Sequence, residues 1–394
     1  MNIEQKYYID LLSDYVVQRK SIPCPEIDWS KVLTLSRIHQ TEGIVYYQAN
    51  SFLPDAFKKA LENNYYATVY EFVNRKRLIS NIASVFEESN IDFIMVKGFE
   101  MAKYYPNPAL RTMGDCDIVV SRTDFPRTVN VLRNMGFRGS NTISSEQWGC
   151  YKNQLYFEIH DRLVQEGEFA TNQQASFFNN YTPYVDHGIL DPNFHFMFLL
   201  MHLRKHFLNH GVGIRQFMDL AVLSQYADLQ LKWEWIDSKF KEIELQKFSH
   251  TCYALIENWF GVSIPIERES LSAEDVNQIT DKILKNGVFG LDDIANQNAN
   301  AHTALLKAKG PMWLRRLIVL YQNVFLSYET MRGYSECEFV DGKPWLLPLA
   351  WGKRLISILR RKDKSNTIRV IKNSFIRESE LDDRIELLNK MGLL

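Results

Sequence analysis

The sequence predicts an α+β protein in which a small mixed β-sheet core carries helical segments before and after it. Short, β-branched apolar runs are concentrated between residues 91 and 165, whereas apolar residues on both sides of that region recur at helical spacing. A chain of 394 residues also exceeds the size at which one hydrophobic core keeps growing. We therefore expect four parts: a helical N-terminal segment (1–62), the sheet core (63–190), a helical domain facing the cleft of the core (191–300) and a helical C-terminal segment (301–394).

The elements follow one another in a readable order. Apolar residues at three- and four-residue spacing predict helices within residues 1–62 and again from Tyr65 to about Ser89. The run Ile91-Asp-Phe-Ile-Met-Val96 predicts a strand, followed by a helix from Gly98 through Tyr105. Residues 113–120 predict a second strand, so the core alternates helix and strand.

The remaining core elements are a helix and a pair of strands. Ser/Thr/Asp capping residues open a helix at Ser121, and Gly136 ends it. Two strand-like pieces follow within residues 137–165, of which Gln154 to His160 is the clearer. From Phe194 to the C-terminus the pattern is helical almost throughout, without an internal repeat.

Composition narrows the class of protein. Hydrophobic residues make up 46% and charged residues 24%, which is typical of a soluble globular chain, and the formal net charge of −1 offers no global attraction for polyanions. The five cysteines are scattered and never form a Cys-x-x-Cys pair, which argues against a disulfide framework or a zinc knuckle. No apolar run reaches the roughly 18 residues of a membrane span, and the N-terminus lacks a signal pattern. We expect a cytoplasmic protein.

Three acidic residues form the main candidate site. Asp115 and Asp117 are two apart in the second predicted strand, and side chains in a strand alternate, so both project from one face. Glu158 lies between apolar neighbours in a later predicted strand. If the two strands pair, three carboxylates converge, and Mg²⁺ is the usual cation for such oxygens. Taken alone, an Asp-x-Asp pair is equally typical of solvated acids at a strand start.

A candidate phosphate site precedes the acids. Lys97-Gly98 stands at a strand-to-helix junction, where backbone N–H groups favour anions and glycine permits close approach. Lys97 and Arg111 add positive charge. Phosphoryl chemistry mainly requires positioning and charge neutralisation, so this arrangement suits in-line nucleotidyl transfer.

These motifs resemble a known family. The runs 93–98, 105–120 and 132–137 (FIMVKG, YPNPALRTMGDCDIVV and LRNMGF) are similar to the uncharacterised nucleotidyltransferase family of the polymerase-β-like superfamily, over roughly residues 65–225. The resemblance implies that Gly98 grips a triphosphate, that Asp115 and Asp117 bind two divalent metals, and that Glu158 completes the site. Phe99 stands where the superfamily has Gly or Ser, and the spacing from Gly98 to Asp115 is longer than usual. We hypothesise that Lys97 compensates.

A helix rich in histidine follows the core. His202, His206 and His210 are spaced by four and share one helix face, but the intervening residues lack the glutamate of zinc proteases. Histidines packed against the core and a structural zinc site both remain open. Arg215 and Asp219, also spaced by four, suggest an ion pair. The resemblance implies that His206, Lys205, Arg215 and Asp219 face the nucleotide site and bind phosphate or orient a metal ligand.

The C-terminal part contains a basic stretch. Residues 353–372 hold eight basic residues against the single acid Asp363 and follow the apolar run Trp345 to Trp351. A solvated helix face, a membrane-surface helix and a polyanion-binding patch each fit this pattern.

The resemblance and the carboxylates together predict the function. We expect a nucleotidyltransferase that uses Mg²⁺ or Mn²⁺ to move a nucleoside monophosphate from an NTP to a hydroxyl acceptor, releasing pyrophosphate. Asp115, Asp117 and Glu158 are the expected catalytic residues and metal ligands. The acceptor is a protein, an RNA, a sugar or a small molecule, and the sequence does not choose among them. The alternative is a catalytically degenerate nucleotide-binding or scaffold protein with the same fold.

Overall fold

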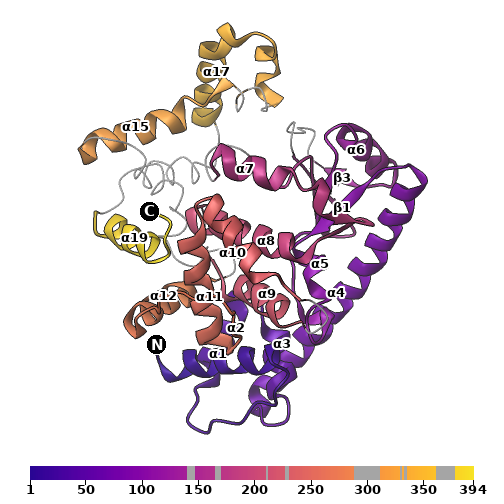
Figure 1. The fold of residues 1–394 in the computed structure, drawn as a ribbon. Helices are drawn as coiled ribbons and strands as arrows, with labels where there is room; N and C mark the ends of the chain where they lie inside the picture. The colour runs from indigo at the N-terminus through magenta and orange to yellow at the C-terminus, as the bar shows by residue number, and fades with distance from the viewer. Residues whose placement is uncertain are drawn as a thin grey trace.

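A five-stranded mixed sheet lies between two groups of helices (Figure 1). The fold comes from a computed structural model that describes residues 1–139, 147–164, 170–209, 212–226, 230–287, 311–328, 331, 335–360 and 378–394.

The sheet has the strand order β1-β2-β5-β4-β3. Its strands are β1 (Phe93–Val96), β2 (Asp117–Val120), β3 (Arg138–Gly139), β4 (Gln147–Lys152) and β5 (Leu155–His160). Strands β2 and β5 pair in parallel, and the other neighbours are antiparallel. A separate hairpin consists of β6 (Val185–Asp186) and β7 (Ile189–Leu190).

Helices precede, interrupt and follow the sheet. The α-helices are α1 (Ile3–Val16), α2 (Trp29–Ile38), α3 (Glu42–Ala49), α4 (Asp55–Glu88), α5 (Gly98–Ala102), α6 (Phe125–Asn134), α7 (Asn172–Asn179), α8 (Pro192–Asn209), α9 (Ile214–Gln225), α10 (Trp233–Glu242), α11 (Gln246–Phe260), α12 (Ala273–Asn286), α15 (Met312–Val324), α17 (Leu347–Arg360) and α19 (Glu378–Lys390). Short 3-10 turns are η1 (Pro108–Leu110), η2 (Thr182–Tyr184), η3 (Ser335–Val340) and η4 (Pro344–Leu346).

The mixed α+β class predicted from the sequence is confirmed, with differences in individual elements. Helix α4 begins at Asp55, about ten positions before the predicted start, and runs through the predicted boundary at 62/63. The described residues between 137 and 164 form three strands, because β3 adds a short edge strand to the two expected. The helix after Lys97 ends at Ala102, and β2 begins only at Asp117, so Asp115 lies in the preceding loop and not in the strand.

Alternation along the strands gives the sheet two different faces. On one face, Ile118, Val120, Phe157 and Ile159 pack in a hydrophobic cluster with residues of α4 and α6. The predicted end of α6 is confirmed, since Gly136 adopts a φ of 84° just beyond the helix, but α6 begins at Phe125 and not at the predicted Ser121. The C-terminal half of α4, α6 and the strands are thus held together by one apolar layer.

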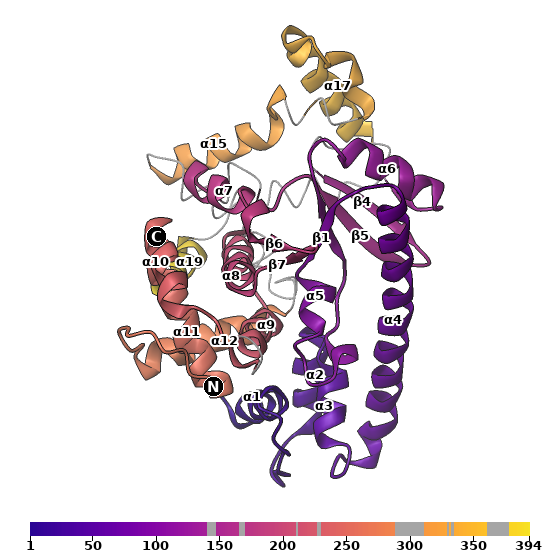
Figure 2. The same ribbon diagram turned by 45° about the vertical axis from the view of Figure 1, so that its right-hand side comes forward.

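The opposite face of the sheet carries both apolar and polar side chains. Ile94, Val96 and Val119 belong to the second large hydrophobic cluster, which includes most of α8, α9 and α11. Asp117, Glu158 and His160 lie on this same face by strand register. Figure 2 shows the sheet between α4 on one side and α8 on the other. The polar residues therefore lie on the side of the sheet that faces α8.

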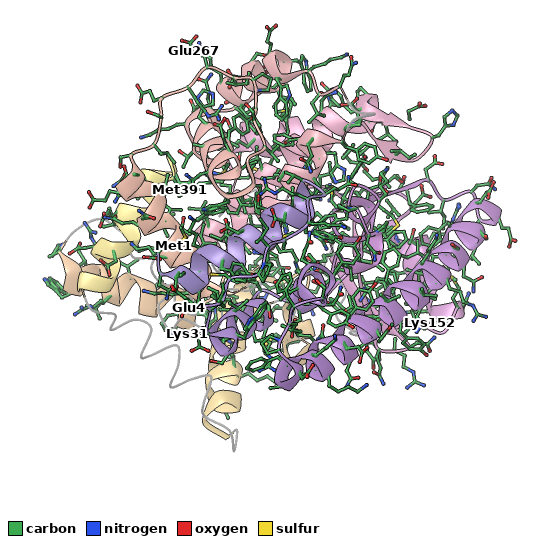
Figure 3. The ribbon with its side chains drawn as sticks, turned by 90° about the horizontal axis from the view of Figure 1, so that it is seen from below. Met1, Glu4, Lys31, Lys152, Glu267 and Met391 are labelled. Carbon is green, nitrogen blue, oxygen red and sulfur yellow. The ribbon has the colours of Figure 1, made fainter. Side chains whose placement is uncertain are left out.

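Both ends of the chain contact α12. The N-terminal ammonium lies 3.5 Å from Asp281 of α12. The ammonium of Lys390, in α19, lies 3.0 Å from Asp275, which is also in α12. Figure 3, seen from below, shows Met1 and Met391 on this side of the molecule, with Glu4 and Lys31 paired nearby at 3.0 Å. These contacts tie the N-terminal helices and α19 to α12.

The C-terminal basic stretch falls mostly outside the described residues. Residues 361–377 of this stretch are not described. Trp345, just before α17, and Leu349, within α17, are both exposed. Among the residues that the structure describes, no helix combines the length and apolarity needed to cross a membrane. All five cysteines are free.

Candidate metal and nucleotide site

Strand pairing brings Asp117 and Glu158 side by side. The parallel register of β2 and β5 sets Asp117 opposite Glu158 and Val119 opposite His160. Residues two apart in a strand share a face, so His160 joins Glu158. Oxygen or nitrogen atoms of Asp117, Glu158 and His160 all lie within 4.8 Å of one another. Glu158 is thus on the same side of the sheet as Asp117.

His160 is a site residue that the sequence analysis did not single out. Its Nε2 lies 3.1 Å from Asp117 Oδ1 and 3.4 Å from Glu158 Oε2. Burial lowers the pKa of His160, but its hydrogen bonds to the two carboxylates outweigh burial and raise that pKa overall. The sequence did contain a signal for His160, because it lies two residues after Glu158 in the same strand and therefore shares its face.

Asp115 lies next to this group without belonging to the strand. The neighbouring residue Cys116 continues the pairing with β5, because its N–H donates to Tyr156 O at 3.1 Å and its carbonyl accepts from Glu158 N at 2.9 Å. Burial and then repulsion from Asp117 raise the pKa of Asp115. The loop therefore holds Asp115 close enough to the other acids for their charges to interact.

Lys97 reaches into the carboxylate group. Its Nζ lies 2.6 Å from Asp117 Oδ1, and its backbone N–H donates to His195 Nε2 at 3.3 Å. Burial alone would raise the pKa of Asp117, but the ammonium of Lys97 and the His160 imidazole hold it below its usual range. Lys97 also has a positive φ of 56°, an uncommon and strained conformation for a residue with a Cβ. The structure thus places a cation directly against the acids.

The turn at Gly98 is packed more tightly than an open phosphate loop. A Cβ at position 98 would lie 3.2 Å from Asp115 O and 3.6 Å from an Arg111 nitrogen, so only glycine fits without movement of the acidic loop. Phe99 stacks on Phe72 of α4, with ring centroids 5.7 Å apart. Phe99 therefore anchors α5 to α4.

Helix α8 forms the opposite wall of a cavity of about 340 Å³. His202 and His206 point their Nε2 atoms at each other, 2.8 Å apart, and both line the cavity with Lys205. All ten site residues predicted from the sequence line this cavity: Lys97, Gly98, Arg111, Asp115, Asp117, Glu158, Lys205, His206, Arg215 and Asp219. Residues from five separate chain segments thus meet at one place.

Arg111, Arg215 and Asp219 are buried and already bonded to other segments. Arg111 makes a bidentate contact with Asp219, at 3.1 Å from Nε and 2.6 Å from Nη2. Tyr105 donates its hydroxyl to the same carboxylate at 2.7 Å. Arg215 donates to Thr112 and Gln40 at 2.6 and 3.0 Å. The predicted ion pair between Arg215 and Asp219 is replaced by contacts that connect α9 to other segments, because Asp219 pairs with Arg111 and Arg215 bonds to Thr112 and Gln40.

The donor set fits a divalent cation. Carboxylate oxygens suit Mg²⁺ and Mn²⁺, and an imidazole nitrogen beside them favours Mn²⁺ or another transition metal over Mg²⁺. Asp117 and Glu158 supply oxygen and His160 supplies nitrogen within the 4.8 Å group. Since the Lys97 ammonium touches Asp117, a cation bound there would share or displace that contact.

Comparison with known proteins assigns the chain to a family. A family model described as uncharacterised nucleotidyltransferase matches residues 25–261, well over half of the chain, and includes every residue of the site above. No curated protein and no solved structure matches the chain. The chain belongs to the uncharacterised nucleotidyltransferase family.

Proposed function

We propose that the protein is a metal-dependent nucleotidyltransferase of the polymerase-β-like type, which moves an NMP from an NTP to an acceptor hydroxyl and releases pyrophosphate. The observation that carries the proposal is the strand register that sets Asp117 beside Glu158 in a cavity, with Asp115 and His160 next to them.

Each group has a role in this proposal. Asp115, Asp117, Glu158 and His160 would hold the cations, which lower the pKa of the acceptor hydroxyl and neutralise the leaving phosphates. Glu158 is only partly buried and faces the cavity, so its carboxylate can also accept the proton of that hydroxyl.

The wall of α8 supplies positive charge from the other side. Lys205 and His206 line the cavity opposite the sheet, where their N–H groups can bind triphosphate oxygens. Arg111 bonds to Asp219, and Arg215 bonds to Thr112, so these contacts join segment 108–114 to α9. The proposed role of Arg111, Arg215 and Asp219 is therefore to fix the walls around the nucleotide.

The decisive experiment measures transfer of a labelled α-phosphate from the NTP to an acceptor. The protein would be incubated with each α-labelled NTP, Mn²⁺ or Mg²⁺ and a cell extract. We expect the Asp115→Ala, Asp117→Ala double variant to lose at least about a hundredfold in label transfer, because metal ligands matter at least as much as the groups that orient them. The matched control is Asp186→Ala, which removes an acid with 94% exposure from the β6–β7 hairpin. Transfer that survives the double substitution would refute the assigned site.

Lys97 has a separable role in binding the nucleotide. We propose that its ammonium moves from Asp117 to the triphosphate when NTP and metal bind, replacing the hydroxyl contact that Phe99 cannot make. A lost charged hydrogen bond of about 1.5–3 kcal/mol predicts that Lys97→Ala weakens NTP affinity roughly 10- to 100-fold. The same variant should bind Mn²⁺ more tightly without NTP, since no ammonium competes. Calorimetry measures both, and an unchanged NTP affinity would contradict this role.

A second candidate function is nucleotide binding without catalysis. Two features favour it: the Lys97 ammonium already pairs with Asp117, and Phe99, which stands where the superfamily pattern has Gly or Ser, offers no hydroxyl and packs on Phe72. A protein of this kind would bind NTP in calorimetry but give no labelled product with any metal.

A further inference from the structure

A second and larger cavity adjoins the proposed nucleotide site. Its volume is about 1190 Å³, and we call it the α4 groove because one wall is the face of α4 between residues 64 and 81. The other walls are segment 109–114, the β4–β5 turn at 152–155, and Arg37, Gln40 and Glu42. At about 1.5 Å per residue, the α4 wall is roughly 25 Å long. The groove therefore has room for an extended chain.

The α4 groove carries a local excess of positive charge. Two of the arginines in its lining are already paired, Arg75 with Glu71 at 2.6 Å and Arg111 with Asp219 at 2.6 Å. The remaining charged residues of the lining are Arg37, Arg77 and Lys152 against the single acid Glu42. Arg77 and Arg37 are exposed. Since the chain as a whole has a formal net charge of −1, this excess is a property of the groove. Such a surface is complementary to phosphates.

Exposed aromatic and amide side chains accompany the charge. Tyr70 lines the groove with 72% of its surface exposed, and Tyr66, one helical turn earlier, is 60% exposed. Asn153 and Gln154 present amides at the tip of the β4–β5 turn. Aromatic faces beside a basic groove are the combination with which proteins bind single-stranded nucleic acid, because bases stack while phosphates pair with cations.

The groove is physically joined to the acidic loop. Arg111 and Gly114 line both the groove and the nucleotide cavity, and Gly114 immediately precedes Asp115. The buried guanidinium of Arg75 donates to Met113 O and Cys116 Sγ, both at 3.3 Å, and so braces this loop from the groove side. A chain lying in the groove would thus end close to the metal ligands.

We propose that the α4 groove binds a single-stranded polynucleotide and presents its terminal hydroxyl to the acids at Asp115 and Asp117. The proposal rests on the proposed nucleotidyl transfer and names the acceptor class. A small-molecule acceptor would need an enclosed, mostly apolar pocket, and a protein acceptor would need an apolar interface centre. The groove offers neither, since its lining is dominated by charged and amide side chains.

The test measures RNA binding apart from catalysis. A fluorescein-labelled single-stranded RNA of about 12 nucleotides, a typical site length, is titrated with the full chain and followed by anisotropy at two salt concentrations. We expect Arg77→Glu to weaken RNA affinity at least tenfold and to flatten its salt dependence, and Tyr70→Ala to weaken it at least about fivefold through lost stacking. The matched control is Lys76→Glu, since Lys76 is exposed on α4 but does not line the groove. It should change affinity less than about twofold.

Three results would overturn the proposal that the α4 groove binds the acceptor RNA. They are no RNA affinity in the unmodified protein, equal losses of RNA affinity in Arg77→Glu and Lys76→Glu, and label transfer to protein with none to RNA. The same oligonucleotide as DNA tests whether the 2′-hydroxyl is read. NTP affinity, measured by calorimetry on each variant, reports on folding and on the nucleotide cavity. RNA binding that the groove variants lose, with no label transfer in the unmodified protein, would support the groove and overturn the catalytic proposal.

Discussion

At the scale of residues, the site is set by a few side chains with opposed charges. Two acids and one imidazole lie together on one face of β2 and β5, and Asp115 adds a third acid from the adjoining loop. The Lys97 ammonium, 2.6 Å from Asp117, reduces the repulsion among these acids. Without a cation, carboxylates this close raise one another's pKa. Lys97 allows the protein to fold with Asp117 ionised, which keeps the cation site ready for a metal and its NTP.

His160 provides the first residue-scale prediction. If its Nε2 is a metal ligand, His160→Ala should weaken Mn²⁺ affinity about 10- to 100-fold and shift metal preference toward Mg²⁺, because an oxygen-only site remains. Calorimetric Mn²⁺ titration measures this, with His187→Ala as the control, since His187 is 94% exposed on the β6–β7 hairpin. Unchanged Mn²⁺ affinity would leave His160 as a hydrogen-bond partner of Asp117 only.

At the scale of elements, one buried ion pair links segment 108–114 to α9. Arg111 and Asp219 are 7% and 3% exposed, and Tyr105 donates to the same carboxylate. Arg111 also lies beside Gly98, where a Cβ would meet its guanidinium at an ordinary contact distance of 3.6 Å. The pair therefore positions the wall shared by the nucleotide cavity and the α4 groove.

Removing one partner of this pair should be strongly destabilising. Asp219→Asn leaves a buried guanidinium without a counter-charge, which predicts a loss of about 3–5 kcal/mol in the free energy of unfolding. The double variant Arg111→Met, Asp219→Leu should recover much of it, because both charges are then absent. Urea denaturation measures both. Glu242→Gln, which breaks the exposed pair with Lys239, is the control and should cost less than about 1 kcal/mol.

At the scale of the whole molecule, buried histidines connect its parts. His39, following α2, contacts Leu284 O of α12 through Nε2 at 3.2 Å, and His195 of α8 accepts the Lys97 N–H. Burial lowers the pKa of His39 to about 4 and that of His195 to about 3. Both are therefore neutral in the folded protein at neutral pH.

These histidines predict acid sensitivity. Their folded-state pKa values lie below the unfolded value of about 6.5, so between about pH 6.5 and 4 the unfolded chain binds more protons, and stability falls as the pH falls. His160 affects the pH dependence of stability in the opposite direction. Its pKa is raised in the folded protein, so its contribution to the free energy of unfolding is lost as the pH rises.

The thermal midpoint should therefore drop between pH 7 and pH 5. His39→Gln keeps a donor for Leu284 O but cannot be protonated, so its midpoint should drop less over this interval. His187→Gln, at an exposed position, should follow the unmodified protein. An identical pH dependence for His39→Gln would show that His39 does not carry the effect.

Local pattern determined a large part of this protein. Period-two alternation placed Glu158 on one face of its strand, helical periodicity predicted α6 and α8, and Gly136 marked the end of α6 correctly. Such signals succeed because strand and helix geometry fix where neighbouring side chains point. The start of α4 was missed: its first turns carry Phe57 and the buried Leu61 at a spacing of four, and one such pair is too short a pattern to place the start of a helix.

Only the tertiary structure decided which segments meet. The parallel pairing of β2 with β5, the contact of Lys97 with Asp117, and the bonds of Asp219 to Arg111 join residues far apart in the chain. Sequence spacing suggested instead that Asp115 shares the strand and that Arg215 pairs with Asp219. Long-range partners depend on how the packed layers align, and that alignment has no periodic signature in the sequence.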